Sequence, residues 1–240
     1  MATLRRILTI SIPPYHVMSM KNNARSMSFH KLKIALRSFW RSDKDAPVYG
    51  HICQVGDPVL RTQAMPVEPE IICTKDFQAL LGHLKDVMKW YNAVGLAAPQ
   101  IGLPWQIFAV EVTKSHLKSI PKEMRDAQGM EEIPFQVFIN PTLRVTDYTV
   151  LRLPERCESI RGYSADVPRS KEVEVTALTE KGKSITWIAK GWSARIVQHE
   201  YDHLQGRVFT DIMDPKTFNC TAWNAINGCR GRIELKYIPK

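Results

Sequence analysis

The segment GWSARIVQHEYDHLQG, residues 191–206, contains two histidines four positions apart with a glutamate beside the first. On a helix, His199 and His203 lie one turn apart on the same face, so both imidazoles can bind one ion. Glu200 lies on the flank of this pair, where its carboxylate can reach a water molecule at the ion. The pattern therefore predicts a metal site with a general base. The alternative is that both histidines are core residues with internal hydrogen bonds, because they share an apolar stripe of the helix.

A catalytic metal site of this kind takes a third protein ligand and leaves one position open. Three carboxylates downstream of the histidines, Asp211, Asp214 and Glu234, are candidates that spacing alone does not exclude. Cys157 is a candidate upstream, although a free cysteine is more often a small buried apolar residue. The residues alone leave both choices open.

Sequence periodicity predicts the first elements that must position these side chains. Apolar residues recur at helical spacing from 74 to 93, and Thr74 is suited to cap the helix. Two segments rich in β-branched and aromatic residues, 106–112 and 135–140, predict strands. The polar stretch between them, 113–134, predicts a loop or an excursion from the sheet.

Two further elements follow before the chain reaches its C-terminal part. Alternating segments between residues 171 and 191 flank Glu180-Lys181-Gly182, which is typical of a β-hairpin. A helix is predicted from about 192 to 205, with Gly206 suited to end it. We therefore expect an α+β domain in which antiparallel strands pack around a late helix that carries the His-Glu-x-x-His motif. Asp202 on that helix either supports the site or is a solvated residue.

Charge is distributed unevenly along the chain. Residues 1–42 contain eight of the 33 Lys and Arg residues and no acid, which leaves 25 basic and 24 acidic residues in the remainder. This composition predicts a mitochondrial transit peptide over residues 1–44 and a catalytic domain over residues 45–240. The alternative is a disordered basic tail or an arm that contacts nucleic acid. If the leader is a targeting segment, the net charge of +9 says little about partners, and we expect no direct nucleic-acid binding.

Two global features exclude other classes. No run approaches the roughly 20 apolar residues of a membrane-spanning helix, so no membrane span is predicted. The five cysteines form an odd set without a Cys-x-x-Cys pair, which argues against a disulfide framework. A chemically important cysteine here would act alone, as a nucleophile or a metal ligand.

Three motifs together resemble the peptide deformylase family. GLAAPQIG (residues 95–102), Cys157 within ERCES, and QHEYDHLQG (residues 198–206) match that family in order and rough spacing. The resemblance extends from about Gly56 to Phe218. CES, ARIVQHE and DIMDPKTF are similar to the animal mitochondrial branch in particular.

The resemblance implies a ligand set and a reaction. Cys157, His199 and His203 would bind one divalent ion, Fe²⁺ being expected, with Zn²⁺, Ni²⁺ or Co²⁺ as substitutes. Glu200 would take a proton from the water that attacks the formyl carbon of an N-formylmethionyl peptide. It would then return the proton to the leaving amine, so that the products are formate and a free N-terminus.

The resemblance also implies how the substrate is held. The side-chain amide of Gln100 and the backbone N–H of Glu158 would donate hydrogen bonds to the developing oxyanion. Gly95, with Ala97 and Ala98, would let the peptide backbone approach closely and pair like an added strand. Without the resemblance, these small residues also fit a plain loop that follows a helix.

The sequence departs from the family pattern at three positions. The usual Glu-Gly-Cys-Leu-Ser is Glu-Arg-Cys-Glu-Ser here, so Arg156 replaces a glycine and Glu158 replaces an apolar residue. Arg156 would strain the strand if that glycine has a positive φ, or crowd the cleft. Glu158 keeps its backbone donor, but its charge is unfavourable to an anionic transition state. Ala93 replaces the first glycine of the family's Gly-x-Gly-Leu-Ala-Ala, a milder change.

The leading hypothesis is an active deformylase of the mitochondrial matrix that acts on nascent mitochondrial proteins, with reduced activity because of Arg156 and Glu158. The second is a weak or inactive relative that binds metal and peptide. A zinc endopeptidase is a third hypothesis, and it needs a downstream carboxylate ligand and leaves the Gln100 motif unexplained. A homodimer is expected by resemblance to the animal branch.

Overall fold

The structure is a computed structural model that describes residues 48–238. The predicted leader, residues 1–44, therefore lies outside the described residues. Helices, 3₁₀ helices (η) and strands occur in the following order: η1 (Pro58–Arg61), η2 (Pro69–Ile71), α2 (Lys75–Trp90), β1 (Gly95–Ala97), η3 (Ala98–Ile101), β2 (Ile107–Val112), α3 (Lys114–Lys118), α4 (Lys122–Gln128), β3 (Ile133–Glu155), η4 (Glu158–Ile160), β4 (Tyr163–Leu178), β5 (Ser184–Lys190), α5 (Trp192–Leu204), η5 (Phe209–Asp211), η6 (Pro215–Thr217), β6 (Asn219–Cys220) and α6 (Trp223–Gly228).

Helix α2 confirms the first helix predicted from periodicity. The side chain of Thr74 accepts a hydrogen bond from the backbone N–H of Phe77, which satisfies one of the donors that a helix start leaves unpaired. One face of the helix is buried in the core with the apolar residues of β1 and β2. That buried face consists of Phe77, Leu80, Leu81, Leu84, Val87 and Met88.

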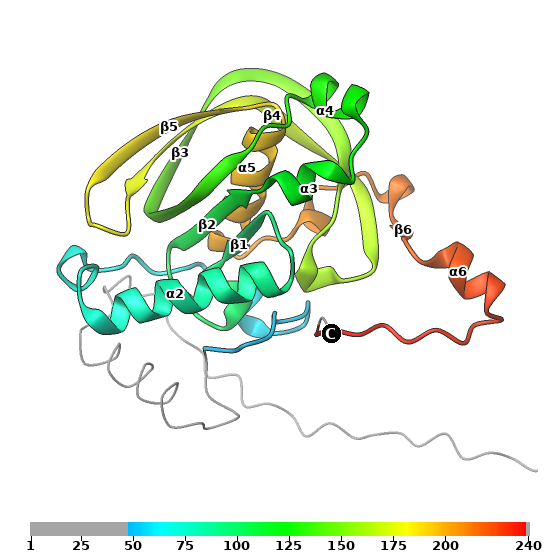
Figure 1. Cartoon of the computed structure of the whole chain (residues 1–240), viewed down its shortest axis with the longest axis horizontal. Coiled ribbons are helices and arrows are strands. Elements are labelled where there is room, and N and C mark those ends of the chain that lie inside the picture. Colours follow the sequence, from blue (N-terminus) through cyan, green and yellow to red (C-terminus); the bar gives the residue numbers. More distant parts are fainter. Residues whose placement is uncertain (1–47, 239–240) are drawn as a thin grey trace, which may run out of the picture.

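The strands form an antiparallel sheet in the order β1-β2-β3-β4-β5, and β6 pairs with β4. Strands β3 and β4 are long, and their register shifts between Ile139 and Thr142 and again between Val145 and Asp147. Such irregularities bend a strand. Figure 1 shows β3, β4 and β5 curving around α5, with α2 crossing the lower part of the domain. The α+β class with antiparallel strands is confirmed.

Residues 113–134 form an excursion between β2 and β3 and not a plain loop. The segment contains α3 and α4, and β3 already begins at Ile133. Thr113 caps α3 by accepting a hydrogen bond from the N–H of His116, and Gly129, with φ of 61°, ends α4. These helices have five and seven residues, which is too short for an apolar period to be visible in a polar sequence.

Helix α5 confirms the predicted late helix, and its apolar face packs against the sheet. Ala194, Val197 and Leu204 are buried in one cluster with Phe108 of β2 and Phe138 of β3. The hairpin that precedes α5 is also confirmed, because β4 and β5 are paired on either side of residues 179–183. The same packing that buries α5 in the sheet sets the position of its histidines.

Helix α5 stops where the sequence predicted. Gly206 has φ of 69°, a conformation that glycine adopts at little cost. A Cβ atom at this position would lie 2.8 Å from the carbonyl oxygen of Arg61, so the close approach of η1 also requires glycine.

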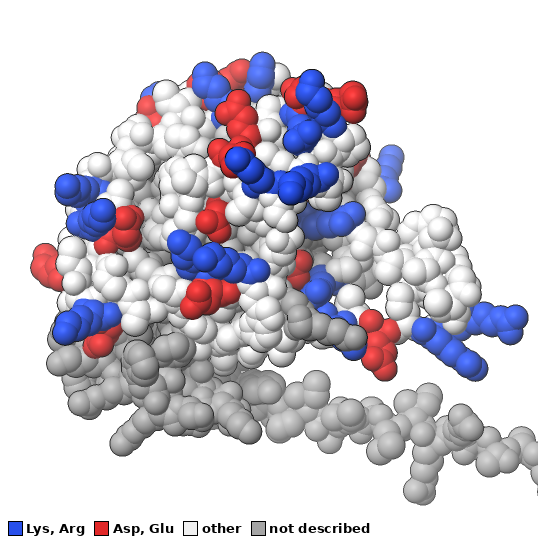
Figure 2. Space-filling model, in the orientation of Figure 1, with Lys and Arg blue, Asp and Glu red and all other residues white. Residues whose placement is uncertain are grey.

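Two surface features bear on the expected partners. Between residues 48 and 238 we find no helix that combines the length and apolar composition needed to cross a membrane. Figure 2 shows Lys and Arg side chains intermixed with Asp and Glu over the visible face of the domain.

Candidate metal centre

Cys157, His199 and His203 come together beside the C-terminal half of α5. One ligand atom from each residue lies within 4.8 Å of the other two. Cys157 Sγ lies 3.3 Å from His203 Nε2, and the two imidazole rings are 5.2 Å apart between centroids. The histidines are one turn apart on α5, and Cys157 is delivered by the turn that follows β3. The structure thus brings together the three residues that the motifs singled out.

The downstream carboxylates, which spacing left as alternatives, have other roles. Asp211 pairs with Arg61 at 2.5 Å and accepts a hydrogen bond from the N–H of Val208. Asp214 accepts from the N–H of Lys216 at the start of η6. Neither they nor the exposed Glu234 belong to a group of clustered ligand atoms within residues 48–238.

His203 is not a core residue satisfied by internal hydrogen bonds. His203 is completely buried, yet its Nδ1 has no hydrogen-bond partner among the described residues. Its other nitrogen is the one that approaches Cys157. A buried polar atom without a hydrogen-bond partner lowers the stability of the fold. This cost favours a metal-binding role for the His203 imidazole over a purely structural role.

The donor set and its surroundings fit a divalent transition metal. A thiolate and two imidazoles are ligands that Zn²⁺ and Fe²⁺ accept. Glu200 is only 4% exposed, and its Oε2 has no hydrogen-bond partner in the described part of the chain. Burial raises the pKa of this carboxyl to about 7, which suits a group that accepts and returns a proton near neutral pH.

A buried ion-pair network supports one of the histidines. Glu155 Oε2 accepts a hydrogen bond from His199 Nδ1 at 2.9 Å, and Glu155 Oε1 accepts one from Arg169 Nε at 2.9 Å. Arg169 also contacts Asp202, which in turn binds Arg207. Asp202 is therefore a buried member of this network and not a solvated residue. Burial disfavours ionisation of Glu155, but the hydrogen bonds from His199 and Arg169 outweigh it and hold its pKa well below the usual range.

Sequence reasoning missed Glu155. The signal that could have found it is its position two residues before Cys157, because alternate residues of an extended strand share a face. Its carboxylate orients the His199 ring and fixes a proton on Nδ1, which leaves Nε2 for an ion.

Gln100 is held rigidly beside Cys157. Its Oε1 accepts a hydrogen bond from the N–H of Ala97 at 2.9 Å. Its Nε2 donates to Ser159 Oγ at 3.2 Å and approaches Cys157 Sγ at 3.6 Å. The amide donor is therefore preorganised at the edge of the ligand group.

Gly95 begins β1, the edge strand of the sheet. A Cβ atom at Gly95 would lie 2.8 Å from Cδ and 2.9 Å from Cγ of Glu200. The space beside the buried carboxylate exists because residue 95 lacks a side chain. An edge strand also has one side available for pairing with an added peptide.

A cavity of about 270 Å³ lies next to the ligand group, and Gly95, Arg156, Glu158, His199 and Glu200 are among its lining residues. Arg156 is not among the residues with positive φ, so the backbone strain considered above does not occur. Its side chain lines the cavity, so it can still crowd the cleft. Burial raises the pKa of Glu158, and the guanidinium of Arg161 opposes that rise.

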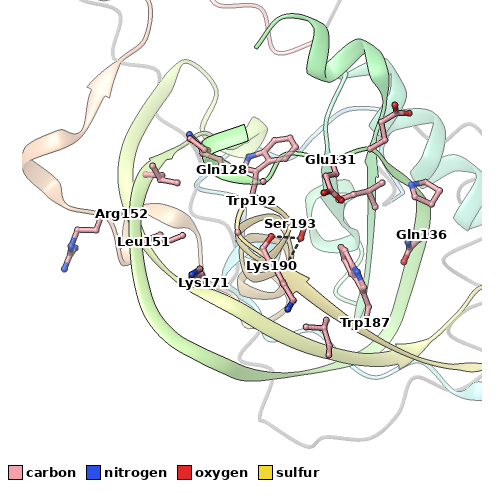
Figure 3. Close-up of a pocket in the computed structure, with 18 residues that line it drawn as sticks. Gln128, Glu131, Gln136, Leu151, Arg152, Lys171, Trp187, Lys190, Trp192 and Ser193 are labelled. Atoms are coloured by element: carbon pink, nitrogen blue, oxygen red, sulfur yellow. Dashed lines mark hydrogen bonds between the residues drawn. The ribbon is translucent and has the colours of Figure 1, made fainter. Parts of the chain in front are cut away.

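A second cavity of about 830 Å³ lies between the concave side of β3 and β5 and the α4 segment. Figure 3 shows Trp187 and Trp192 among its lining side chains, with the Ser193 hydroxyl bonded to Lys190. Trp192 lines both cavities, so it forms the wall that they share.

Three clustered ligand atoms with an adjacent buried carboxylate are the arrangement of a metal-dependent hydrolase. Comparison with known proteins identifies the family. Residues 49–219 match the model of the polypeptide deformylase family, and the chain belongs to that family. It is 43% identical over 197 residues to the mitochondrial peptide deformylase of Homo sapiens, which covers 80% of this chain and 81% of that protein.

Other peptide deformylases support the same family assignment. The chain is 41% identical over 167 residues to the chloroplastic peptide deformylase 1A of Solanum lycopersicum, which covers 70% of this chain and 60% of the plant protein. The Met-Ala-Ser-bound class I type b peptide deformylase of Acinetobacter baumannii superposes with a TM-score of 0.60 at 26% identity, over 68% of this chain and 96% of that one. The Synechococcus elongatus peptide deformylase in complex with actinonin gives 0.57 at 28% identity, over 79% and 90%.

Proposed function

We propose that this protein is a metal-dependent hydrolase that removes the N-formyl group from the initiator methionine of nascent mitochondrial proteins and releases formate. Membership of the polypeptide deformylase family supports the reaction. The observation that carries the proposal is the group of Cys157, His199 and His203, with the buried Glu200 beside it.

Cys157, His199 and His203 are the proposed metal ligands. A divalent ion held by them would act as a Lewis acid and make water nucleophilic at neutral pH. Glu200 accepts a proton from the attacking water as a bond forms between the water oxygen and the formyl carbon. When the carbon–nitrogen bond breaks, Glu200 returns this proton to the amine, so that formate and a free N-terminus leave.

Two donors are proposed to stabilise the oxyanion that develops on the formyl oxygen. The first is the side-chain amide of Gln100, which is fixed by its bonds to Ala97 and Ser159. The second is the backbone N–H of Glu158. Such donors are most effective when the protein holds them in place before the reaction. Gly95 and the free side of β1 would bind the peptide backbone in an extended form.

We also propose Fe²⁺ as the native ion, with Zn²⁺, Ni²⁺ or Co²⁺ able to replace it, and a location in the mitochondrial matrix. The mitochondrial human relative and the acid-free basic leader support the location. The transit peptide over residues 1–44, the catalytic domain over residues 45–240 and the homodimer remain proposals that rest on sequence.

The decisive experiment is formate release from a formyl-Met peptide by the purified protein loaded with Fe²⁺ under anaerobic conditions. We expect turnover that disappears in Glu200→Ala, while that variant still binds the ion because Glu200 is not a ligand. A folded, metal-loaded wild-type protein that releases no formate would favour the alternative, a deformylase-like protein that only binds metal and peptide.

A further inference from the structure

Arg195 lies one helical turn before His199 on α5, and only 5% of its surface is exposed. Its Nη1 donates a hydrogen bond to Glu155 Oε1 at 2.7 Å. The guanidinium therefore joins α5 to both β3 and β4 through one carboxylate and several main-chain oxygens. The main-chain acceptors are the carbonyl oxygens of Val167 at 2.9 Å, Leu153 at 3.3 Å and Leu151 at 2.8 Å.

Arg195 belongs to a buried ion-pair network. The ion pairs of this network join two buried carboxylates, Glu155 and Asp202, to two buried guanidiniums, Arg169 and Arg195. Arg169 forms ion pairs with both carboxylates, at 2.9 Å to Glu155 and 2.5 Å to Asp202. Loss of Arg195 would leave these two carboxylates with one buried guanidinium between them, and removing one partner of a buried ion pair is strongly destabilising.

Glu155 connects Arg195 to the metal centre. Its Oε1 accepts hydrogen bonds from Arg195 and Arg169, and its Oε2 accepts from Arg169 Nη2 at 3.0 Å and from His199 Nδ1 at 2.9 Å. A carboxylate held by two guanidiniums in this way orients the imidazole that it contacts. Partners of this kind, in contact with a metal-binding histidine, typically change metal affinity when they are removed.

Arg195 also links the two chain segments that carry the proposed ligands. Strand β3 ends at Glu155, two residues before Cys157, and α5 carries His199 and His203. The contacts from Arg195 to the end of β3 therefore help to set the separation between the thiolate and the imidazoles.

We propose that Arg195 is a positioning residue of the metal centre, which holds α5 and the Glu155 carboxylate in the arrangement that brings His199 and Cys157 to one ion. The proposal rests on the metal ligands of the proposed function. It assigns a role to a residue outside the three motifs, and that role does not depend on which reaction follows.

The test measures metal affinity in the purified protein. Arg195→Met removes the guanidinium and keeps an unbranched apolar stem. We expect the Zn²⁺ affinity of the folded variant, measured by competition with a chromogenic chelator, to fall about 10- to 100-fold. Arg195→Lys keeps the charge but reaches fewer acceptors, so we expect a smaller loss. The visible spectrum of the Co²⁺-loaded protein should change as well, because it reports the geometry around the ion.

Arg207→Met provides a matched control within the same network. Arg207 binds Asp202 at 2.7 Å on the exposed rim of the cluster and has no contact with Glu155 among the described ion pairs. We expect its Zn²⁺ affinity to stay within about twofold of wild type, since the hydrogen bond from His199 to Glu155 is untouched.

A double-mutant cycle tests the route through Glu155. If Arg195 acts through this carboxylate, Arg195→Met combined with Glu155→Gln loses less affinity than the product of the two single losses. If the affinity loss of the double variant equals the product of the two single losses, Arg195 does not act through Glu155.

Wild-type Zn²⁺ affinity and an unchanged Co²⁺ spectrum in folded Arg195→Met would overturn the proposal. If Arg195→Met does not fold, the same measurements are made on Arg195→Lys. Wild-type Zn²⁺ affinity in Arg195→Lys would then overturn the proposal. A wild-type protein that binds Zn²⁺ but releases no formate from a formyl-Met peptide would instead refute the proposed function and leave this test intact.

Discussion

Replacing Gly95 by alanine should disable catalysis without removing the metal. The added Cβ would lie 2.8 Å from Cδ and 2.9 Å from Cγ of Glu200, and closer still to Oε1, whereas ordinary contacts begin near 3.4 Å. The backbone of Gly95 is not in the left-handed region, so alanine meets no conformational penalty there. The contact with Glu200 is the dominant consequence of the change.

The size of the effect follows from the burial of Glu200. Because this residue is only 4% exposed, its carboxylate cannot swing into solvent to avoid the new methyl group. Relief of the contact requires a displacement of about 1 Å, and a misplacement of that size can lower a rate by about 100-fold. We therefore expect kcat for formate release to fall by about this factor, with bound metal retained.

The assay compares Gly95→Ala with Gly82→Ala. A Cβ at Gly82 of α2 meets no atom within 4 Å, so this control should keep wild-type kcat and gain slightly in stability, since alanine favours a helix. Wild-type kcat in Gly95→Ala would refute the steric reasoning. Loss of metal from Gly95→Ala would also refute it, because the ligands would then have been disturbed in place of Glu200.

Three other substitutions test separate parts of the structure. Cys157→Ser should lose the divalent ion while Asp211→Ala keeps it, as metal analysis of the purified proteins can establish; equal metal contents would disprove the ligand assignment. Gly206→Ala should lower the free energy of unfolding in urea by about 2 kcal/mol more than Gly182→Ala, since both glycines have positive φ but only Gly206 faces a backbone oxygen. If both variants lose the same free energy of unfolding, the contact of the new Cβ with the Arg61 carbonyl oxygen relaxes without cost. Arg156→Gly should raise kcat/KM by clearing the cleft, and an unchanged value would remove the steric reason for doubting this position.

Local signals in the sequence predicted most of the elements around the site. Thr74 marked the start of α2, the residues around Gly182 marked the hairpin, and Gly206 marked the end of α5. These features are governed by capping, by turn conformation and by apolar period, all of which act within a few residues. Helices α3 and α4 escaped prediction because each is too short to show a period.

The sequence by itself determined that His199, Glu200 and His203 share one region of a helix, because helical geometry relates residues four positions apart. It did not single out the third proposed ligand, since from the residues alone Cys157 and the downstream carboxylates were comparable candidates. Only the tertiary structure placed the thiol that follows β3 3.3 Å from His203 and directed Asp211 to Arg61. It also buried Glu155 between His199 and Arg195. Distances between segments remote in sequence depend on how a curved sheet encloses a helix, and no local pattern encodes them.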